Sequence, residues 1–158
     1  MYIYLGGKYD IINIFIISKG ENKIMIKLSD FKCPEINNLI AMAMFGSYGT
    51  EFWINNKSDI DILVLLEYRI DASTEFKIED TLIPLLEDHF NYKNIHLTFI
   101  YMNEFASPFA KHYIESNDKL IIDSLKEIDF RLYVNKYIRE NQWIQNIIDR
   151  DMKLLRGN

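Results

Sequence analysis

The chain has 158 residues, which suffices to bury one sizeable core, so we expect a single domain over residues 1–158. Its 18 Lys and Arg residues and 23 Asp and Glu residues give a net charge of -5, which argues against a general surface for long nucleic acids. Cys33 is the only cysteine, so no intramolecular disulfide is expected, and a reduced, cytoplasmic setting is the simplest interpretation.

The N-terminal part of the chain carries an apolar segment, Lys8–Ser18. Its apolar run is short, is interrupted by Asn13 and has no basic leader, so we interpret it as a buried element rather than a signal peptide. No stretch reaches the roughly 20 apolar residues that span a bilayer, and we expect no membrane partner. Lys23–Leu28 alternates in a way that fits either a strand or a short helix.

A continuous apolar run, Leu39–Phe45, has the length of a buried strand and delivers Gly46 and Ser47 at its end. Glycine allows a backbone to approach a phosphate closely, and turn amides and a serine hydroxyl can donate hydrogen bonds to phosphate oxygens. A Gly-Ser pair alone is too common in loops to indicate a site. What indicates a site is that this pair stands between two predicted strands, the second of which begins with acidic residues.

That next strand begins with two acids, Asp59 and Asp61, in an alternating aliphatic run that continues to Glu67. Alternation places both carboxylates on one face, roughly 6.5 to 7 Å apart along the strand. Hard oxygen ligands in this arrangement favour Mg²⁺, which also binds substrate phosphates. An isolated Asp-x-Asp would more often be a solvated strand end, and the preceding Gly-Ser turn favours the metal site.

The composite of strand, Gly-Ser, polar loop and Ser-Asp-x-Asp resembles the nucleotidyltransferase superfamily related to DNA polymerase β, and within it the minimal nucleotidyltransferases. The resemblance covers about Asn37–Asp123. It implies that Gly46, Ser47 and Ser58 bind the nucleotide, and that the two aspartates bind the metal and act in catalysis.

The loop departs from the family pattern, because Thr50 and Glu51 stand where members often carry a basic residue and then glycine. It also has about one residue more than is usual. Phe52 and Trp53 within it are either stacking surfaces for a substrate or loop anchors that pack on the core.

The third carboxylate of active relatives should lie on the strand Asn94–Met102, where the alternation presents His96 or Thr98 to the site. Histidine exchanges a proton near neutral pH, so His96 is our candidate for a general base, although imidazole is a poorer Mg²⁺ ligand than carboxylate. Glu104 follows the strand and is a weaker candidate. Two interpretations are open: catalysis is reduced or lost, or another residue takes the role of the third carboxylate.

The remaining segments predict helices around this sheet. Asp71-Ala-Ser-Thr suits a helix N-cap before Glu75–Phe90, in which Pro84 implies a kink or two short helices. A second helix is expected in Glu104–Ser116 and a short strand in Asp118–Asp123. Apolar residues then recur at three and four positions through a long helix, residues 125–156.

We therefore expect an α+β fold of the nucleotidyltransferase type, with a core at about 37–123. Its small mixed sheet would join the two site-bearing strands and the His96 strand and would be backed by helices on one side. The long C-terminal helix carries more large apolar residues than one core-facing stripe requires, which indicates either a second internal contact or a partner surface.

The leading functional hypothesis is a Mg²⁺-dependent transfer of a nucleoside monophosphate, with ATP as the expected donor, to an acceptor hydroxyl. Minimal nucleotidyltransferases are often paired with HEPN-domain toxins, so the resemblance implies a toxin-antitoxin system in which the acceptor is a toxin tyrosine. A homodimer through the C-terminal helix is the other expected partnership. The alternatives are an antibiotic adenylyltransferase and a module that binds a nucleotide or partner without transfer.

Overall fold

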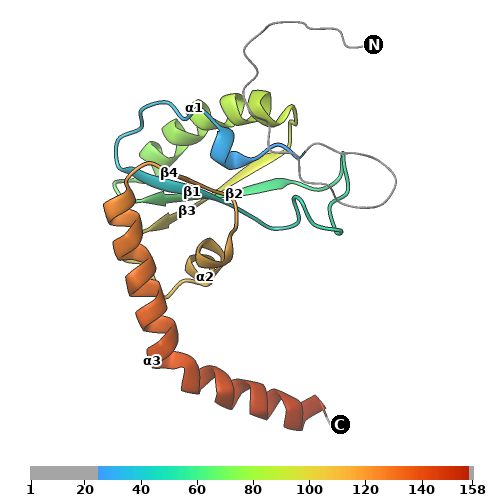
Figure 1. Ribbon diagram of the computed structural model, residues 1–158, viewed down its shortest axis with the longest axis vertical. Helices are drawn as coiled ribbons and strands as arrows, with labels where there is room; N and C mark the ends of the chain where they lie inside the picture. The colour runs from blue at the N-terminus through green and yellow to red at the C-terminus, as the bar shows by residue number, and fades with distance from the viewer. Residues whose placement is uncertain (1–24, 157–158) are drawn as a thin grey trace, which may run out of the picture.

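A computed structural model describes residues 25–156, so the predicted segment Lys8–Ser18 lies outside the described residues. Figure 1 shows a sheet with helices above and below it and a long helix that leads away to the C-terminal end. In chain order the elements are η1 (Leu28–Asp30), β1 (Leu39–Phe45), β2 (Ile60–Leu66), α1 (Ala72–Phe90), β3 (Ile95–Tyr101), α2 (Pro108–Glu115), β4 (Lys119–Ile121) and α3 (Ser124–Arg156).

The four described strands form one mixed sheet in the order β3-β2-β1-β4. β1 pairs antiparallel with both β2 and β4, whereas β2 and β3 run parallel because α1 connects them. β1 and β2 are the central strands, and almost every residue in them is buried. This explains why both read as continuous apolar runs and confirms the expected mixed sheet and α+β class.

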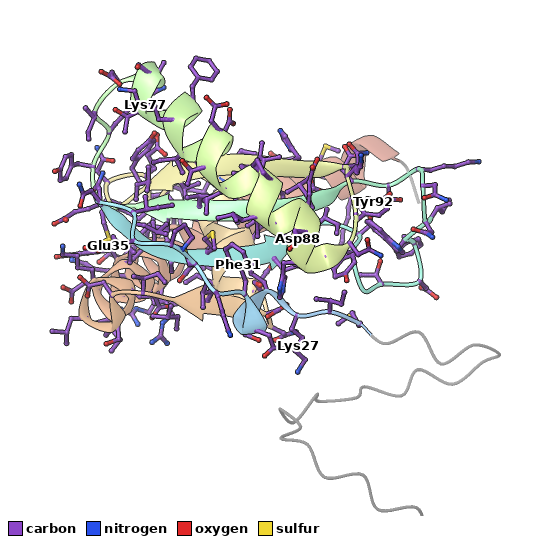
Figure 2. The ribbon with its side chains drawn as sticks, turned by 90° about the horizontal axis from the view of Figure 1, so that it is seen from above. Lys27, Phe31, Glu35, Lys77, Asp88 and Tyr92 are labelled. Carbon is purple, nitrogen blue, oxygen red and sulfur yellow. The ribbon has the colours of Figure 1, made fainter. Side chains whose placement is uncertain are left out.

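Helices cover both faces of this sheet, so the expectation of helices on one side only is wrong. α1 packs on one face through buried side chains spaced by four residues: Ile78, Leu82, Leu86 and Phe90. Figure 2, which views the molecule from above, shows α1 lying across the sheet. The opposite face of β1 and β2 is equally apolar and needs its own cover, which α2 and α3 supply through Ala110, Tyr113, Phe130 and Val134.

α1 is one uninterrupted helix, rather than the two short helices that Pro84 suggested as an alternative. The Asp71 side chain caps its N-terminus by accepting hydrogen bonds from the backbone N–H of Thr74 at 2.7 Å and from its hydroxyl at 2.8 Å. Leu82 and Leu86 are fully buried on either side of the proline, so packing on the sheet holds the helix together across it.

In the described part of Lys23–Leu28, residues 25–27 form neither the strand nor the helix that was expected, and residues 23 and 24 lie outside the described residues. Residues 25–27 are irregular, and η1 begins at Leu28. The Asp118 carboxylate, which lies next to β4, accepts hydrogen bonds from the backbone N–H groups of Leu28 at 2.7 Å and Ser29 at 2.9 Å. Asp118, about 90 positions away in sequence, therefore holds the start of η1 in place.

α3 coincides with the predicted C-terminal helix, and its first turns complete the core below the sheet. Glu127 is only 1% exposed, and it accepts hydrogen bonds from the Tyr113 hydroxyl at 3.1 Å and the Arg131 Nε at 2.9 Å. Burial, reinforced by the neighbouring Glu127 carboxylate, raises the pKa of Tyr113, so its hydroxyl remains a donor. Within residues 25–156, no helix has the length and apolar character needed to cross a membrane.

Candidate active site

The Gly-Ser turn directly follows β1 and makes a close approach to the acidic strand. Gly46 has a φ of +77°, and a Cβ built on it would lie 2.4 Å from the Asp61 Oδ2. Any larger residue would therefore collide with this carboxylate and would also adopt a strained backbone conformation. Glycine at this position allows the turn and the acid to share one site.

The same turn exposes backbone donors. Among residues 25–156, the N–H groups of Ser47, Tyr48 and Gly49 donate no hydrogen bond, and the Ser47 hydroxyl makes none. The turn itself is closed through the Ser47 carbonyl, which accepts from the Thr50 N–H at 2.9 Å and from its hydroxyl at 2.7 Å. Consecutive amides in such a turn suit an anion such as a phosphate group.

The rest of the loop is held by aromatic packing. The Trp53 ring lies 4.9 Å from the Tyr48 ring and 5.2 Å from the Tyr92 ring between centroids. Trp53 is thus a loop anchor, the second of the two roles considered for it. Phe52 is 74% exposed, which leaves its aromatic face open to solvent.

Ser58 helps to shape this loop. Its hydroxyl oxygen accepts a hydrogen bond from the Ile54 N–H at 3.1 Å, and its carbonyl accepts one from the Tyr92 hydroxyl at 2.6 Å. The hydroxyl proton of Ser58 is not used in these bonds, so a contact from Ser58 to a nucleotide stays a prediction.

The parallel register of β2 and β3 decides which residue of β3 faces the acids. Asp61 lies opposite His96, and the His96 Nδ1 is 3.3 Å from the Asp61 Oδ1. Thr98 lies opposite Leu63, further along the strand. Of the two residues expected to face the site, His96 is therefore the one that lies beside Asp61.

Glu104 does not reach this site. Its carboxylate accepts a hydrogen bond from the Tyr101 N–H at 3.3 Å, at the far end of β3. His96, which pairs with Asp61, lies five residues before Tyr101, so a strand length of roughly 17 Å separates the site from the end of β3 that Glu104 contacts.

Asn94 is the functional candidate that the sequence reasoning missed. It immediately precedes β3, and its Nδ2 donates a hydrogen bond to the Asp59 Oδ1. The signal was available in the sequence, since Asn94 and His96 are two positions apart, as are Asp59 and Asp61.

The acids suit a hard divalent cation but do not enclose one. Asp59 and Asp61 offer carboxylate oxygens, which Mg²⁺ prefers. Among the described residues no group of three or more His, Cys, Asp or Glu side chains is arranged to hold a metal ion. Mg²⁺ usually keeps several waters and is bound by one or two carboxylates, so this pair of acids fits such an ion with waters, or later the phosphates of a nucleotide, as its remaining ligands.

A cavity of about 380 Å³ adjoins the Gly-Ser turn on the side of α2 and β4. Gly46, Gly49 and Thr50 line it from the turn, and His112 and Glu115 line it from α2. No described lysine or arginine lines this cavity, in keeping with the absence of the basic residue that relatives often place after the Gly-Ser pair. Backbone amides and a cation would have to compensate the charge of a bound phosphate.

Comparisons with known proteins bear on the family and the fold of this chain. The family model "Nucleotidyltransferase domain" matches residues 27–151, and a search of curated proteins finds no match. A mutant of the toxin-antitoxin MntA-HpeT has a TM-score of 0.50 and 19% identity, covering 74% of this chain and 88% of that chain, which shows a shared fold.

Two further solved structures are similar to this chain at lower TM-scores. A toxin-antitoxin structure with AMP-PNP has 22% identity and a TM-score of 0.47, with 74% of this chain and 89% of that chain covered. A complex of tri-AMPylated Shewanella oneidensis HEPN toxin with MNT antitoxin has 20% identity and a TM-score of 0.40, with coverages of 74% and 86%.

Proposed function

Because the chain belongs to the nucleotidyltransferase domain family, we propose that it transfers a nucleoside monophosphate, AMP from ATP in the first place, to an acceptor hydroxyl. The observation that carries this proposal is the close approach of the Gly46 turn to Asp61, which brings free amide donors and an acid to one place. A site of this kind can hold a triphosphate and its cation together.

Asp59 and Asp61 are the residues that would hold Mg²⁺. When bound, the ion neutralises charge on the phosphates and on the departing pyrophosphate. The amides of Ser47, Tyr48 and Gly49 donate to the non-bridging oxygens of the triphosphate, which fixes the α-phosphorus for in-line attack.

His96 accepts the proton in this scheme. The 3.3 Å contact of its Nδ1 with the Asp61 carboxylate favours the tautomer that carries the proton on Nδ1, which leaves the Nε2 lone pair free. The acceptor oxygen attacks the α-phosphorus and a new P–O bond forms, while the bond from that phosphorus to the oxygen bridging to the β-phosphorus breaks. Pyrophosphate leaves with the electron pair, and the hydroxyl proton passes to Nε2.

The acceptor we propose is a tyrosine of a HEPN-domain toxin, so that the chain acts as a cytoplasmic antitoxin. The fold is shared with a chain of the toxin-antitoxin MntA-HpeT. α3 supports a protein partner, because Phe130 and Val134 are its last fully buried described side chains and the helix continues to Arg156. Beyond its buried base, α3 exposes large apolar side chains that include Ile138, Trp143, Ile144, Ile147, Met152 and Leu154.

The test is a labelling experiment. Purified protein is incubated with host lysate, Mg²⁺ and nucleoside triphosphates labelled at the α-phosphate, in parallel with Asp61→Asn and with Asp80→Asn, which alters an exposed acid in the middle of α1. We expect a labelled protein band with the wild type and Asp80→Asn and none with Asp61→Asn.

Each other outcome identifies an alternative. A label on a small molecule that depends on Asp61 would replace the toxin by a small acceptor. The absence of any Asp61-dependent label would contradict transfer and favour a module that only binds a nucleotide or partner. The residue of β3 opposite Asp61 is a histidine rather than a carboxylate, which is compatible with that alternative.

A further inference from the structure

The segment that leads into β3 is bonded to the start of β2 at three successive points. The Tyr92 hydroxyl donates to the Ser58 carbonyl at 2.6 Å, and the Ile60 N–H donates to the Asn94 carbonyl at 2.8 Å. Between these two bonds the Asn94 Nδ2 donates to the Asp59 Oδ1. Figure 2 shows Tyr92 just beyond the end of α1, where this segment begins.

We propose that Asn94 is a positioning residue that orients the Asp59 carboxylate for a divalent cation. This inference rests on the proposed function, because it assigns a task within the same metal site. Asn94 and His96 each hold one acid, so a neutral Asn-x-His pair on β3 faces the Asp-x-Asp pair on β2 in parallel register.

Asp59 needs such a partner more than Asp61 does. Asp61 lies within β2, and both the Gly46 turn and His96 confine its carboxylate. Asp59 is exposed and precedes the strand, so its side chain would otherwise sample several rotamers and lose that freedom when a cation binds. The hydrogen bond from Asn94 restricts Asp59 before the cation arrives.

The chemistry of an amide donor suits this task. Asn94 occupies one oxygen of Asp59 and leaves Oδ2 available as a ligand. Because the amide carries no charge, it does not compete for the cation as an acid would and does not repel it as a lysine would. Hydrogen bonds of this type to metal ligands commonly change metal affinity by about 10- to 100-fold when they are removed.

The backbone around Asn94 is fixed independently of its side chain. The bond from Ile60 uses the Asn94 carbonyl, and the bond from Tyr92 uses its phenolic hydroxyl, so Asn94→Ala retains both. The substitution therefore removes the amide alone, on an exposed residue whose loss leaves no cavity.

The experiment measures Mn²⁺ binding without nucleotide, using the electron paramagnetic resonance signal of the free ion. The full chain, Asn94→Ala, Asp61→Asn and the matched control Asn55→Ala, an exposed asparagine of the preceding loop, are titrated with Mn²⁺. We expect Asn94→Ala to weaken binding by about 10- to 100-fold and Asn55→Ala to leave it unchanged. The unfolding midpoint of metal-free Asn94→Ala should match the wild type, while its rise on adding Mn²⁺ should be smaller.

Two results overturn the inference. One is Mn²⁺ binding by Asn94→Ala within roughly twofold of the wild type, well below the loss typical of such residues. The other is a lower metal-free midpoint with unchanged Mn²⁺ affinity, which would make Asn94 merely structural. A wild-type chain that shows no Asp61-dependent Mn²⁺ binding would instead contradict the metal site of the proposed function, so the two failures are distinguishable.

Discussion

Gly46→Ala is the most direct perturbation of the candidate site, because it adds a single methyl group at the point where the turn meets the acid. The added Cβ would lie 2.4 Å from the Asp61 Oδ2, whereas real Cβ contacts essentially never fall below 3.0 Å. The carboxylate or the turn must therefore move by at least about 0.6 Å. We expect Mn²⁺ affinity and nucleotide transfer to fall together.

Two effects set the size of the expected losses in Gly46→Ala: backbone strain, which lowers stability, and displacement of the Asp61 carboxylate, which lowers the rate of transfer. The left-handed backbone at φ +77° costs a residue with a Cβ about 1 to 2 kcal/mol, which lowers the unfolding midpoint of a chain of this size by roughly 2 to 8 °C. Misplacing a reacting group by about 1 Å can cost on the order of 100-fold in rate, so we expect transfer to fall by about 10- to 100-fold.

Gly49→Ala is the matched control, because its φ is also +77° and its added Cβ would meet the Met25 Sδ at 2.5 Å. Both variants carry the same backbone strain, but the second displaces a flexible thioether rather than an acid. The assay is Mn²⁺ titration with thermal unfolding, followed by transfer of α-labelled nucleotide. Equal losses of Mn²⁺ affinity in the two variants would refute the reasoning, since strain in the turn would then explain both. A Mn²⁺ affinity of Gly46→Ala equal to that of the wild type would also refute the reasoning.

Three further predictions concern the base, a helix cap and the C-terminal helix. His96→Ala should lower the rate of labelled transfer by about 100- to 10,000-fold with Mn²⁺ affinity largely retained, and an unchanged rate would remove His96 from the chemistry. Hydrogen bonds from Thr74 lower the pKa of Asp71, so its contribution to stability is present above the ordinary aspartate pKa of about 4 and is lost as the pH falls below it. Unfolding midpoints of the wild type and Asp71→Ala should accordingly differ at pH 7 and converge at low pH; a constant difference would contradict the cap. Trp143→Ala should leave the unfolding midpoint of the isolated chain unchanged, because the side chain is 61% exposed, and should weaken binding of the proposed HEPN toxin by about 2 kcal/mol or more. Phe130→Ala should lower the free energy of unfolding by about 3 to 5 kcal/mol, measured by urea unfolding. If Trp143→Ala and Phe130→Ala changed the stability equally, the division of α3 into a buried base and an exposed remainder would be contradicted.

Local patterns were sufficient for the secondary structure around the site. The apolar run Leu39–Phe45 and the alternating run after Asp59 predicted β1 and β2 nearly to the residue. Strands that are buried on both faces are apolar along almost their whole length, so their bounds can be seen in the sequence. The segment Asp71-Ala-Ser-Thr predicted an N-cap before a helix at Glu75–Phe90; Asp71 is that cap, and α1 begins at Ala72, three residues earlier than expected. Of the two outcomes that Pro84 implied, a pair of short helices is excluded, because α1 continues through the proline with the flanking Leu82 and Leu86 buried on the sheet.

By itself, the sequence determined the α+β class, the Gly-Ser turn, the acidic pair and the long C-terminal helix, since each follows from the pattern and order of side chains along the chain. Only the tertiary structure decided that His96 rather than Thr98 faces Asp61, that Asn94 holds Asp59, and that helices cover both faces of the sheet. The register between β2 and β3 makes the first two of these choices, and it pairs strands more than thirty residues apart in sequence. A shift by one residue would turn His96 away from the acid, and no local pattern contains that information.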